Sequence, residues 1–241
     1  MLMNLRIKFT KKGYLKYISH LDTMRLFQRA FRRGNIPIKY SQGFNPQPKM
    51  SIANPLALGI ESEEEFMDIE LLKKISEQEF IEIINNQLPD GIKILDAKYV
   101  NDDKSLPSTV RWSYYEINVK TKNMMDKNLL EEKINEWLNK KEIMFERRRY
   151  KKGKEIKDVK NIRPLIGNIS LVKDNKNIND DAKYIIRIRC LLKSGDNGSL
   201  KPTDFLEALD SYLSLNMEIE MADIKRLNIF TEVDGKIQSP M

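Results

Sequence analysis

The sequence predicts an α+β protein made of two tandem ferredoxin-like units, each with the element order β-α-β-β-α-β. Two observations carry this prediction. Segments in which apolar and polar residues alternate, as in half-buried strands, are interspersed with segments whose apolar residues recur at helical spacing. A polar stretch with Pro107, residues 101–109, separates two such sets. We therefore expect a basic N-terminal domain over residues 1–100 and a C-terminal domain over residues 110–234.

The first unit takes its elements from residues 2–100. Helices are expected over residues 19–33 and after Ser76, because Ser19 and Ser76 each have an acidic residue three positions later that completes a capping box. Gly34 suits the residue just beyond the first helix. The acidic residues 63–65 are expected in a solvated turn. Strands are expected at residues 2–9, 50–56, 66–72 and 92–100.

The second unit repeats the pattern with one addition. A basic hairpin, residues 143–149 and 154–159 with its turn at 151–153, is inserted after the first helix. Helices are expected around residues 130–138 and 203–215, and the tail from Asp234 is expected to fray. Strands are expected at residues 115–119, 169–172, 184–192 and 218–233.

The charge distribution favours a polyanionic partner such as RNA. The net charge is +7, yet residues 1–60 hold 11 Lys/Arg and one acidic residue (11 − 1 = +10), whereas residues 61–100 hold 4 Lys/Arg and 11 Asp/Glu (4 − 11 = −7). Positive potential concentrated in one region attracts nucleic acid. The alternative is a basic surface that binds nothing specific.

Composition excludes several classes of protein. One cysteine, Cys190, allows no disulfide within the chain and no iron–sulfur cluster held by this chain alone, and one histidine argues against a histidine-based metal site. Phosphate-binding loops, dinucleotide glycine motifs and zinc spacings are lacking, so no cofactor is expected. No apolar run approaches the ~20 residues of a membrane span, and the N-terminus does not read as a signal peptide, so we expect a cytoplasmic protein without a membrane partner.

The helix at residues 19–33 is amphipathic, with Met24, Leu26, Phe27, Ala30 and Phe31 on one side. The other side holds four arginines in a stripe about 12 Å long, since they stand at Arg25, Arg29, Arg32 and Arg33. Guanidinium groups bind phosphate bidentately, so the stripe is a candidate RNA-binding surface. The alternative is a solvated face, or one paired with the acidic residues of 61–70.

The loop at residues 41–49 is too rich in Gly and Pro for regular structure. Its glycine lets backbone approach a ligand closely, and its phenylalanine offers a stacking face to a base. The alternative is a structural connection with Phe44 in the core. The candidate binding residues are Gln42, Gly43, Phe44, Asn45 and Lys49.

A second basic cluster lies in the predicted hairpin. Residues 143–163 hold nine Lys/Arg and three Asp/Glu (9 − 3 = +6). A basic hairpin can follow a nucleic-acid backbone, and a solvated hairpin without a ligand is the equal alternative. The candidate residues are Arg147, Arg148, Arg149, Lys151 and Lys152.

His20 is the candidate catalytic residue. A histidine beside phosphate-binding arginines can act as general base in metal-independent RNA cleavage. At 100° per residue, however, His20 projects on the same side as Phe27 and Phe31. A structural histidine at the edge of the core is therefore the alternative interpretation.

The chain resembles the radical-SAM-linked family of unknown function over most of its length, most specifically in the run from Lys11 to Leu71. The resemblance is carried by Ser-His-Leu-Asp at 19–22, the basic helix and Ser-Gln-Gly-Phe-Asn-Pro at 41–46, and it weakens after about residue 110. Members of that family occur as a C-terminal domain of a radical SAM protein or as a separate neighbour. The resemblance implies a stand-alone partner of a radical SAM enzyme, since this chain lacks the cluster cysteines. More loosely, the layout resembles repeat-processing CRISPR endoribonucleases, whose C-terminal glycine-rich loop is not evident here.

Together these features favour a non-catalytic RNA-binding adaptor that presents structured RNA, ribosomal or transfer RNA, to a radical SAM enzyme. The first alternative is a metal-independent endoribonuclease that uses His20. The second is a protein–protein interaction module whose basic residues 1–60 face an acidic partner.

Overall fold

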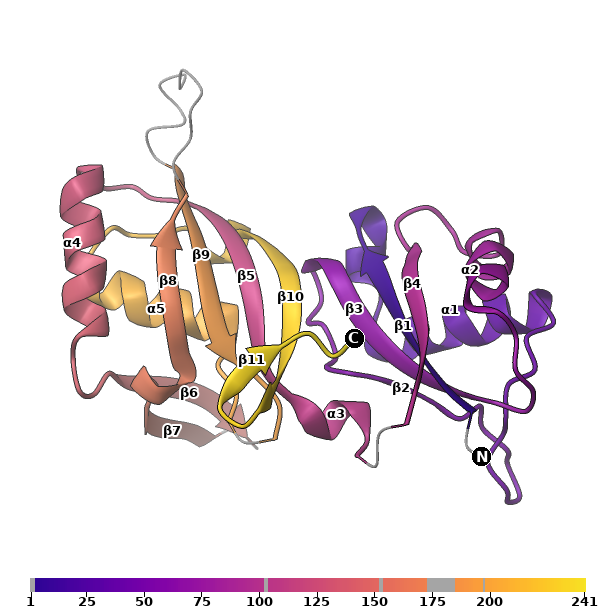
Figure 1. Ribbon diagram of the computed structural model, residues 1–241. Helices are drawn as coiled ribbons and strands as arrows, with labels where there is room; N and C mark the ends of the chain where they lie inside the picture. Colours follow the sequence, from indigo (N-terminus) through magenta and orange to yellow (C-terminus); the bar gives the residue numbers. More distant parts are fainter. Residues whose placement is uncertain (1–2, 102–103, 152–153, 173–184, 197) are drawn as a thin grey trace. The chain divides into compact units, whose positions relative to one another are not determined.

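The computed structural model describes residues 3–101, 104–151, 154–172, 185–196 and 198–241 (Figure 1). Its fold is mixed α+β with mostly antiparallel strand pairing, and the described residues form five α-helices. The chain divides into two compact units. Unit 1 contains Met1–Trp112 and Lys225–Met241, and unit 2 contains Ser113–Ile224. Residues 225–234, which the sequence assigned to the second domain, thus group with the first.

Unit 1 is built around β1 (Met3–Lys11), which lies between β3 (Glu61–Leu71) and β4 (Ile94–Val100) and runs antiparallel to both. β2 (Met50–Ile52) pairs antiparallel with the later part of β3. β10 (Asp223–Val233) runs parallel to the first residues of β3, where Lys225 and Arg226 pair with Glu61 and Ser62. Segments far apart in the sequence therefore meet at the start of β3.

The helices of unit 1 confirm the two predicted caps. In α1 (His20–Arg33) the Ser19 side chain accepts a hydrogen bond from the Asp22 N–H, and in α2 (Glu77–Asn85) Ser76 accepts one from Glu79. Phenylalanines from β1 and both helices pack edge-on, stacked and tilted in a series with centroids 4.9–6.0 Å apart. These rings, Phe9, Phe27, Phe31 and Phe80, lie in the core of the unit.

The end of α1 differs from the sequence prediction. Gly34 is the C-cap with φ −80°, and Asn35 adopts the left-handed conformation at φ 51°. Glycine is needed at position 34 for space, because an added Cβ would lie 2.8 Å from Ile83 Cγ2 of α2. The residue beyond the helix is thus selected by the close approach of the two helices.

The acidic run 63–65 is not a solvated turn, because β3 begins at Glu61 and includes it. The prediction that the tail from Asp234 frays is also wrong. β11 (Lys236–Gln238) forms a hairpin with β10 through a turn in which Asp234 and Gly235 have positive φ. Arg6 then donates a 2.7 Å hydrogen bond to the Pro240 carbonyl, which holds the last residues on unit 1.

The expected linker contains a short helix, α3 (Leu106–Thr109). Leu106 is fully buried and packs with Ala53, Phe66, Val110 and Ile229 in a small second core. This stretch is therefore part of unit 1 and not a solvated connection.

Unit 2 has the strand order β5-β9-β8, with β8 antiparallel to β9. The predicted basic hairpin forms a separate two-stranded sheet, β6 (Met144–Lys151) with β7 (Lys154–Asn161). The other elements of this part of the chain are β5 (Val110–Lys120), α4 (Lys127–Leu138), β8 (Ile166–Leu171), β9 (Ile185–Lys193) and α5 (Pro202–Leu213).

No helix in the described part of the chain is long and apolar enough to cross a membrane.

Candidate nucleic-acid interface

The basic face of α1 consists of its four arginines, and all four side chains are exposed. The opposite face buries Thr23, Phe27, Ala30 and Phe31. Because the helix is fixed by this apolar face and by its Ser19 cap, the arginine stripe is presented at a defined position. The four residues are Arg25, Arg29, Arg32 and Arg33.

Only one of the four arginines forms an ion pair within the described part of the chain. Arg25 lies 3.1 Å from Asp22, and the Ser19 hydroxyl together with this guanidinium lowers the pKa of the Asp22 carboxyl. Arg33 donates hydrogen bonds to the side chain and backbone carbonyls of Gln87. Arg29 and Arg32 have no hydrogen-bond or ion-pair partner among the described residues and remain available to a ligand.

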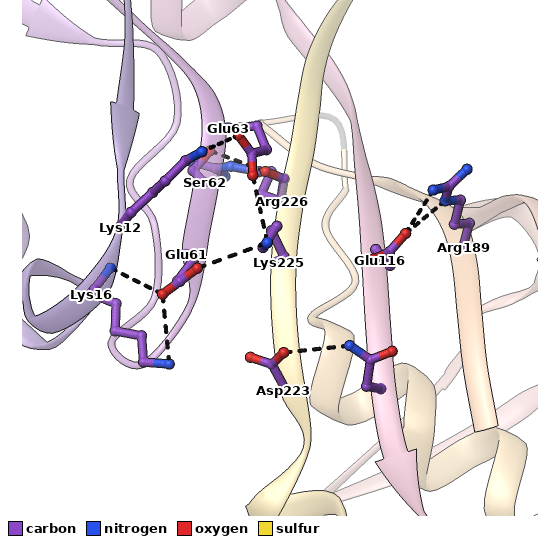
Figure 2. A network of polar contacts seen from close by, with 12 residues as sticks. Lys12, Lys16, Glu61, Ser62, Glu63, Glu116, Arg189, Asp223, Lys225 and Arg226 are labelled. Carbon is purple, nitrogen blue, oxygen red and sulfur yellow. Dashed lines mark hydrogen bonds and ion pairs between the residues drawn. The ribbon is translucent and has the colours of Figure 1, made fainter. Parts of the chain in front are cut away.

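The other cations of residues 1–60 are largely compensated by β3. Figure 2 shows Lys12 with Glu63 and Lys16 with Glu61, and Lys225 of β10 approaches the same two carboxylates. The hydrogen bond from Lys12 lowers the pKa of Glu63. The charge separation seen along the sequence is therefore largely cancelled in space on the sheet, and the uncompensated part lies on α1. Further pairs are Lys8–Glu64, Lys39–Glu70 and Lys49–Glu70.

The loop at residues 41–49 is a small hairpin with an exposed tip. Tyr40 and Pro48 form a β-bridge, and the Ser41 N–H donates to the Gln47 carbonyl at 2.8 Å. Phe44 at the tip is fully exposed, so it is not tucked into the core. The side chains of Gln42 and Asn45 are exposed beside it, and Lys49 pairs with Glu70 at the base.

Two grooves flank the arginine stripe. One, of about 300 Å³, lies between α1 and the base of the loop and is lined by Arg32, Tyr40 and Pro48 together with Gln28 and Asn35. The other, of about 420 Å³, lies between α1 and the end of α2. The basic face and the base of the loop thus border one surface of unit 1. The second groove is lined by Leu26, Arg29, Arg33, Asn86, Gln87, Leu88 and Pro89.

His20 lies on the core side of α1. It is half-buried and borders a cavity of about 10 Å³ with Lys11, Thr23 and Glu65. A cavity of this size has room for about one water molecule. This placement agrees with the structural interpretation of His20 and separates it from the arginine face.

A buried charged group near this cavity was not anticipated from the sequence. Arg226 and Glu65 are 1% and 2% exposed and form a bidentate ion pair, with 2.8 Å between Nε and Oε1. Lys11, also buried, donates to the Ile18 carbonyl at 2.9 Å, and burial lowers the pKa of its ammonium group. The partners Glu65 and Arg226 are 161 positions apart, so no local sequence signal could have joined them.

A sequence model of a family described as an uncharacterized protein conserved in bacteria (DUF2344) matches residues 4–202. The chain belongs to this family. No curated protein matches it.

Among solved structures, this DUF2344 chain is similar to a chain of the crystal structure of a Cbf5-Nop10-Gar1 complex, with a TM-score of 0.52 and 7% identity over 93% of this chain. It covers 48% of that chain, about half of its length. At this identity the likeness concerns the fold alone. An unknown protein from Galdieria sulphuraria is also matched, at 10% identity over 97% of this chain and 100% of that one, with a TM-score of 0.26.

The second basic cluster of the DUF2344 chain lies on the β6–β7 hairpin of unit 2. Arg147 is 3.5 Å from the buried carboxylate of Asp204 in α5, which gives this arginine a structural contact. Arg148, Arg149 and Lys151 lie in β6, and their side chains are outside the described part. Lys152 lies outside the described residues altogether.

Proposed function

We propose that this DUF2344 member is an RNA-binding adaptor that works with a radical SAM enzyme in RNA or ribosome-related modification. One observation carries the RNA-binding half. Arg29 and Arg32 are exposed without partners in the described chain, and Arg32 lines a groove together with the base of the hydrogen-bonded loop that exposes Phe44. Guanidinium groups position phosphates, while aromatic and amide side chains contact bases.

The mixture of groups favours RNA over an acidic protein. Cations suit either partner, and this surface adds exposed amides and an exposed aromatic ring beside them. Gln28 and Asn35 line the same groove as Arg32, and Gln42 and Asn45 flank Phe44. Side chains that donate and accept hydrogen bonds beside an aromatic ring are suited to unpaired bases and ribose hydroxyls.

RNA affinity of charge variants tests this half. The Arg29→Glu/Arg32→Glu protein is compared with Lys93→Glu/Lys98→Glu, which makes the same change in net charge at two exposed lysines of unit 1 in and before β4. We expect the arginine variant to bind ribosomal and transfer RNA fragments about tenfold more weakly or worse, because charge-assisted phosphate contacts are lost. If both variants lost the same amount of RNA affinity, the interaction would depend only on net charge, which would contradict the proposal.

The proposed partnership with a radical SAM enzyme rests on the resemblance of this chain, most specifically of residues 11–71, to radical-SAM-linked proteins. The tagged chain is purified from a bacterium that encodes it, with and without nuclease treatment. We expect a radical SAM enzyme among the retained proteins, and its retention after nuclease treatment would indicate direct contact. Absence of such an enzyme from both preparations would contradict this half and leave RNA binding to stand alone.

The geometry does not favour RNA cleavage by His20. The adjoining cavity of about 10 Å³ is far too small for a phosphodiester group, and its walls include Phe9 and Ile52 of the core. We expect RNA to remain intact after long incubation with the protein in EDTA. Cleavage that is lost in His20→Ala while RNA affinity is retained would restore the endoribonuclease interpretation.

We also infer that both units are ferredoxin-like. Support comes from the unit 1 order β4-β1-β3-β2, in which each paired neighbour is antiparallel, with α1 and α2 as the intervening helices. In unit 2, β5, α4, β8, β9 and α5 follow the first five elements of this pattern along the chain, with the β6–β7 hairpin as an insertion. The strand that completes the pattern, β10, groups mostly with unit 1.

A further inference from the structure

We infer that this interface selects unpaired nucleotides, with a base stacked on Phe44 and neighbouring phosphates on Arg32 and Arg29. The inference rests on the proposed RNA binding and names the class of RNA. It depends on three properties of the 41–49 loop: its rigid base, the complete exposure of its aromatic ring, and its reach from the arginine groove.

The base of the loop is held by backbone hydrogen bonds. The Gln47 N–H donates to Ser41 Oγ at 2.9 Å, in addition to the Ser41–Gln47 backbone bond. Below it, the Lys39 N–H donates to the Glu70 carbonyl at 2.9 Å, and the Glu70 N–H donates to the Lys49 carbonyl at 3.0 Å. These bonds tie both strands of the hairpin to β3 and limit the entropy lost when a ligand binds the tip.

The ring of Phe44 contacts nothing that shields it, since the residue is 109% exposed. Gly43 precedes it with φ 140°, a conformation that favours glycine, and directs the chain through the bend at the tip. Both faces of the ring are accessible to a base. Stacking is tolerant of base identity because every base has a π-face.

The loop is short enough that Phe44 lies near the groove lined by Arg32. Tyr40 lines the groove with Arg32 and is half exposed, and Phe44 follows it by four residues. Four extended residues span at most about 14 Å, so the two contacts fall within a few consecutive nucleotides. In an A-form duplex the bases are stacked inside the helix and cannot reach such a ring, whereas splayed bases of loops and single strands can.

The test compares RNA of about 12 nucleotides with the same RNA annealed to its complement. We expect wild-type protein to bind the single strand at least about tenfold more tightly than the duplex. Phe44→Ala should weaken single-strand binding by about tenfold without changing duplex binding, and Phe44→Trp should retain it. Tyr14→Ala, at an aromatic residue of unit 1 that is 93% exposed, is the matched control and should bind as wild type.

The outcomes separate this inference from the proposed function. Equal affinity for duplex and single strand, or full single-strand affinity in Phe44→Ala, would overturn the inference and leave the ring to contact a protein, while arginine-dependent RNA binding would survive. Absence of binding to either RNA would remove the proposed function itself, and this inference with it.

Discussion

The buried ion pair between Glu65 and Arg226 gives a direct prediction about the stability of unit 1. Both side chains are almost fully removed from solvent, and the Arg226 guanidinium also donates to the Asn54 carbonyl at 2.7 Å. Removal of either partner leaves a buried charge without its main counter-charge. Replacement of both by apolar residues of similar size removes the two charges of the pair together.

We expect Arg226→Met or Glu65→Leu alone to lower the free energy of unfolding by about 3–5 kcal/mol. For a chain of this length each kcal/mol corresponds to about 2–4 °C in Tm, so the midpoint should fall by roughly 6–20 °C. The double variant should be much less destabilised than the sum of the two single variants, because each single loss consists mainly of an isolated buried charge.

Urea unfolding followed by circular dichroism measures these free energies. Glu63→Leu is the matched control, since Glu63 lies two positions away in β3 and its ion pair with Lys12 is partly exposed. We expect Glu63→Leu to lower the free energy of unfolding by less than about 1 kcal/mol. A loss in Arg226→Met as small as in this control, or additive losses in the double variant, would refute the reasoning.

Three further predictions concern a helix cap, a glycine and a buried cysteine that contribute to the stability of the two units. Ser19→Ala should destabilise the protein by about 0.5–2 kcal/mol in urea, through loss of the cap of α1; an unchanged midpoint would count against the cap. Gly91→Ala should lower Tm measurably, because Gly91 has φ 96° and an added Cβ would lie 2.5 Å from the Lys12 carbonyl oxygen; wild-type Tm would contradict this. Burial raises the pKa of the Cys190 thiol, so alkylation at pH 8 should require unfolding. Above a pH of roughly 8.5 the unfolded thiol loses its proton first, so stability should fall as pH rises; rapid alkylation of native protein would disprove the burial.

Local signals made α1 predictable. The serine cap, the apolar face and the arginine stripe all lie within 15 consecutive residues, and the exposure of the four arginines follows from helical periodicity alone. The hairpin character of residues 143–161 was likewise predictable from its basic turn. The location of Phe44 at an exposed tip was one of two alternatives, because a Gly/Pro loop can place an aromatic residue inside or outside.

Long-range pairing was not predictable. The acidic run of β3 has the composition of a solvated turn, because the cations that pair with Glu63 are far away in the sequence: Lys12 follows β1 and Lys225 lies in β10. The Glu65–Arg226 pair depends on the register between β3 and β10, which no local pattern encodes. The final hairpin does have a local signal in Asp234-Gly235, since this dipeptide favours tight hairpin turns, and here that signal prevails over the general tendency of chain ends to fray.

The salt dependence of RNA binding tests the central claim most directly. Each phosphate contact on a single strand contributes about 0.7 to the slope of log affinity against log salt concentration. We predict that Arg29→Gln/Arg32→Gln reduces the slope by about 1.4, while Lys93→Gln/Lys98→Gln leaves it unchanged. A slope unaltered by the arginine changes, or altered equally by both pairs, would contradict the assignment of RNA to the face of α1.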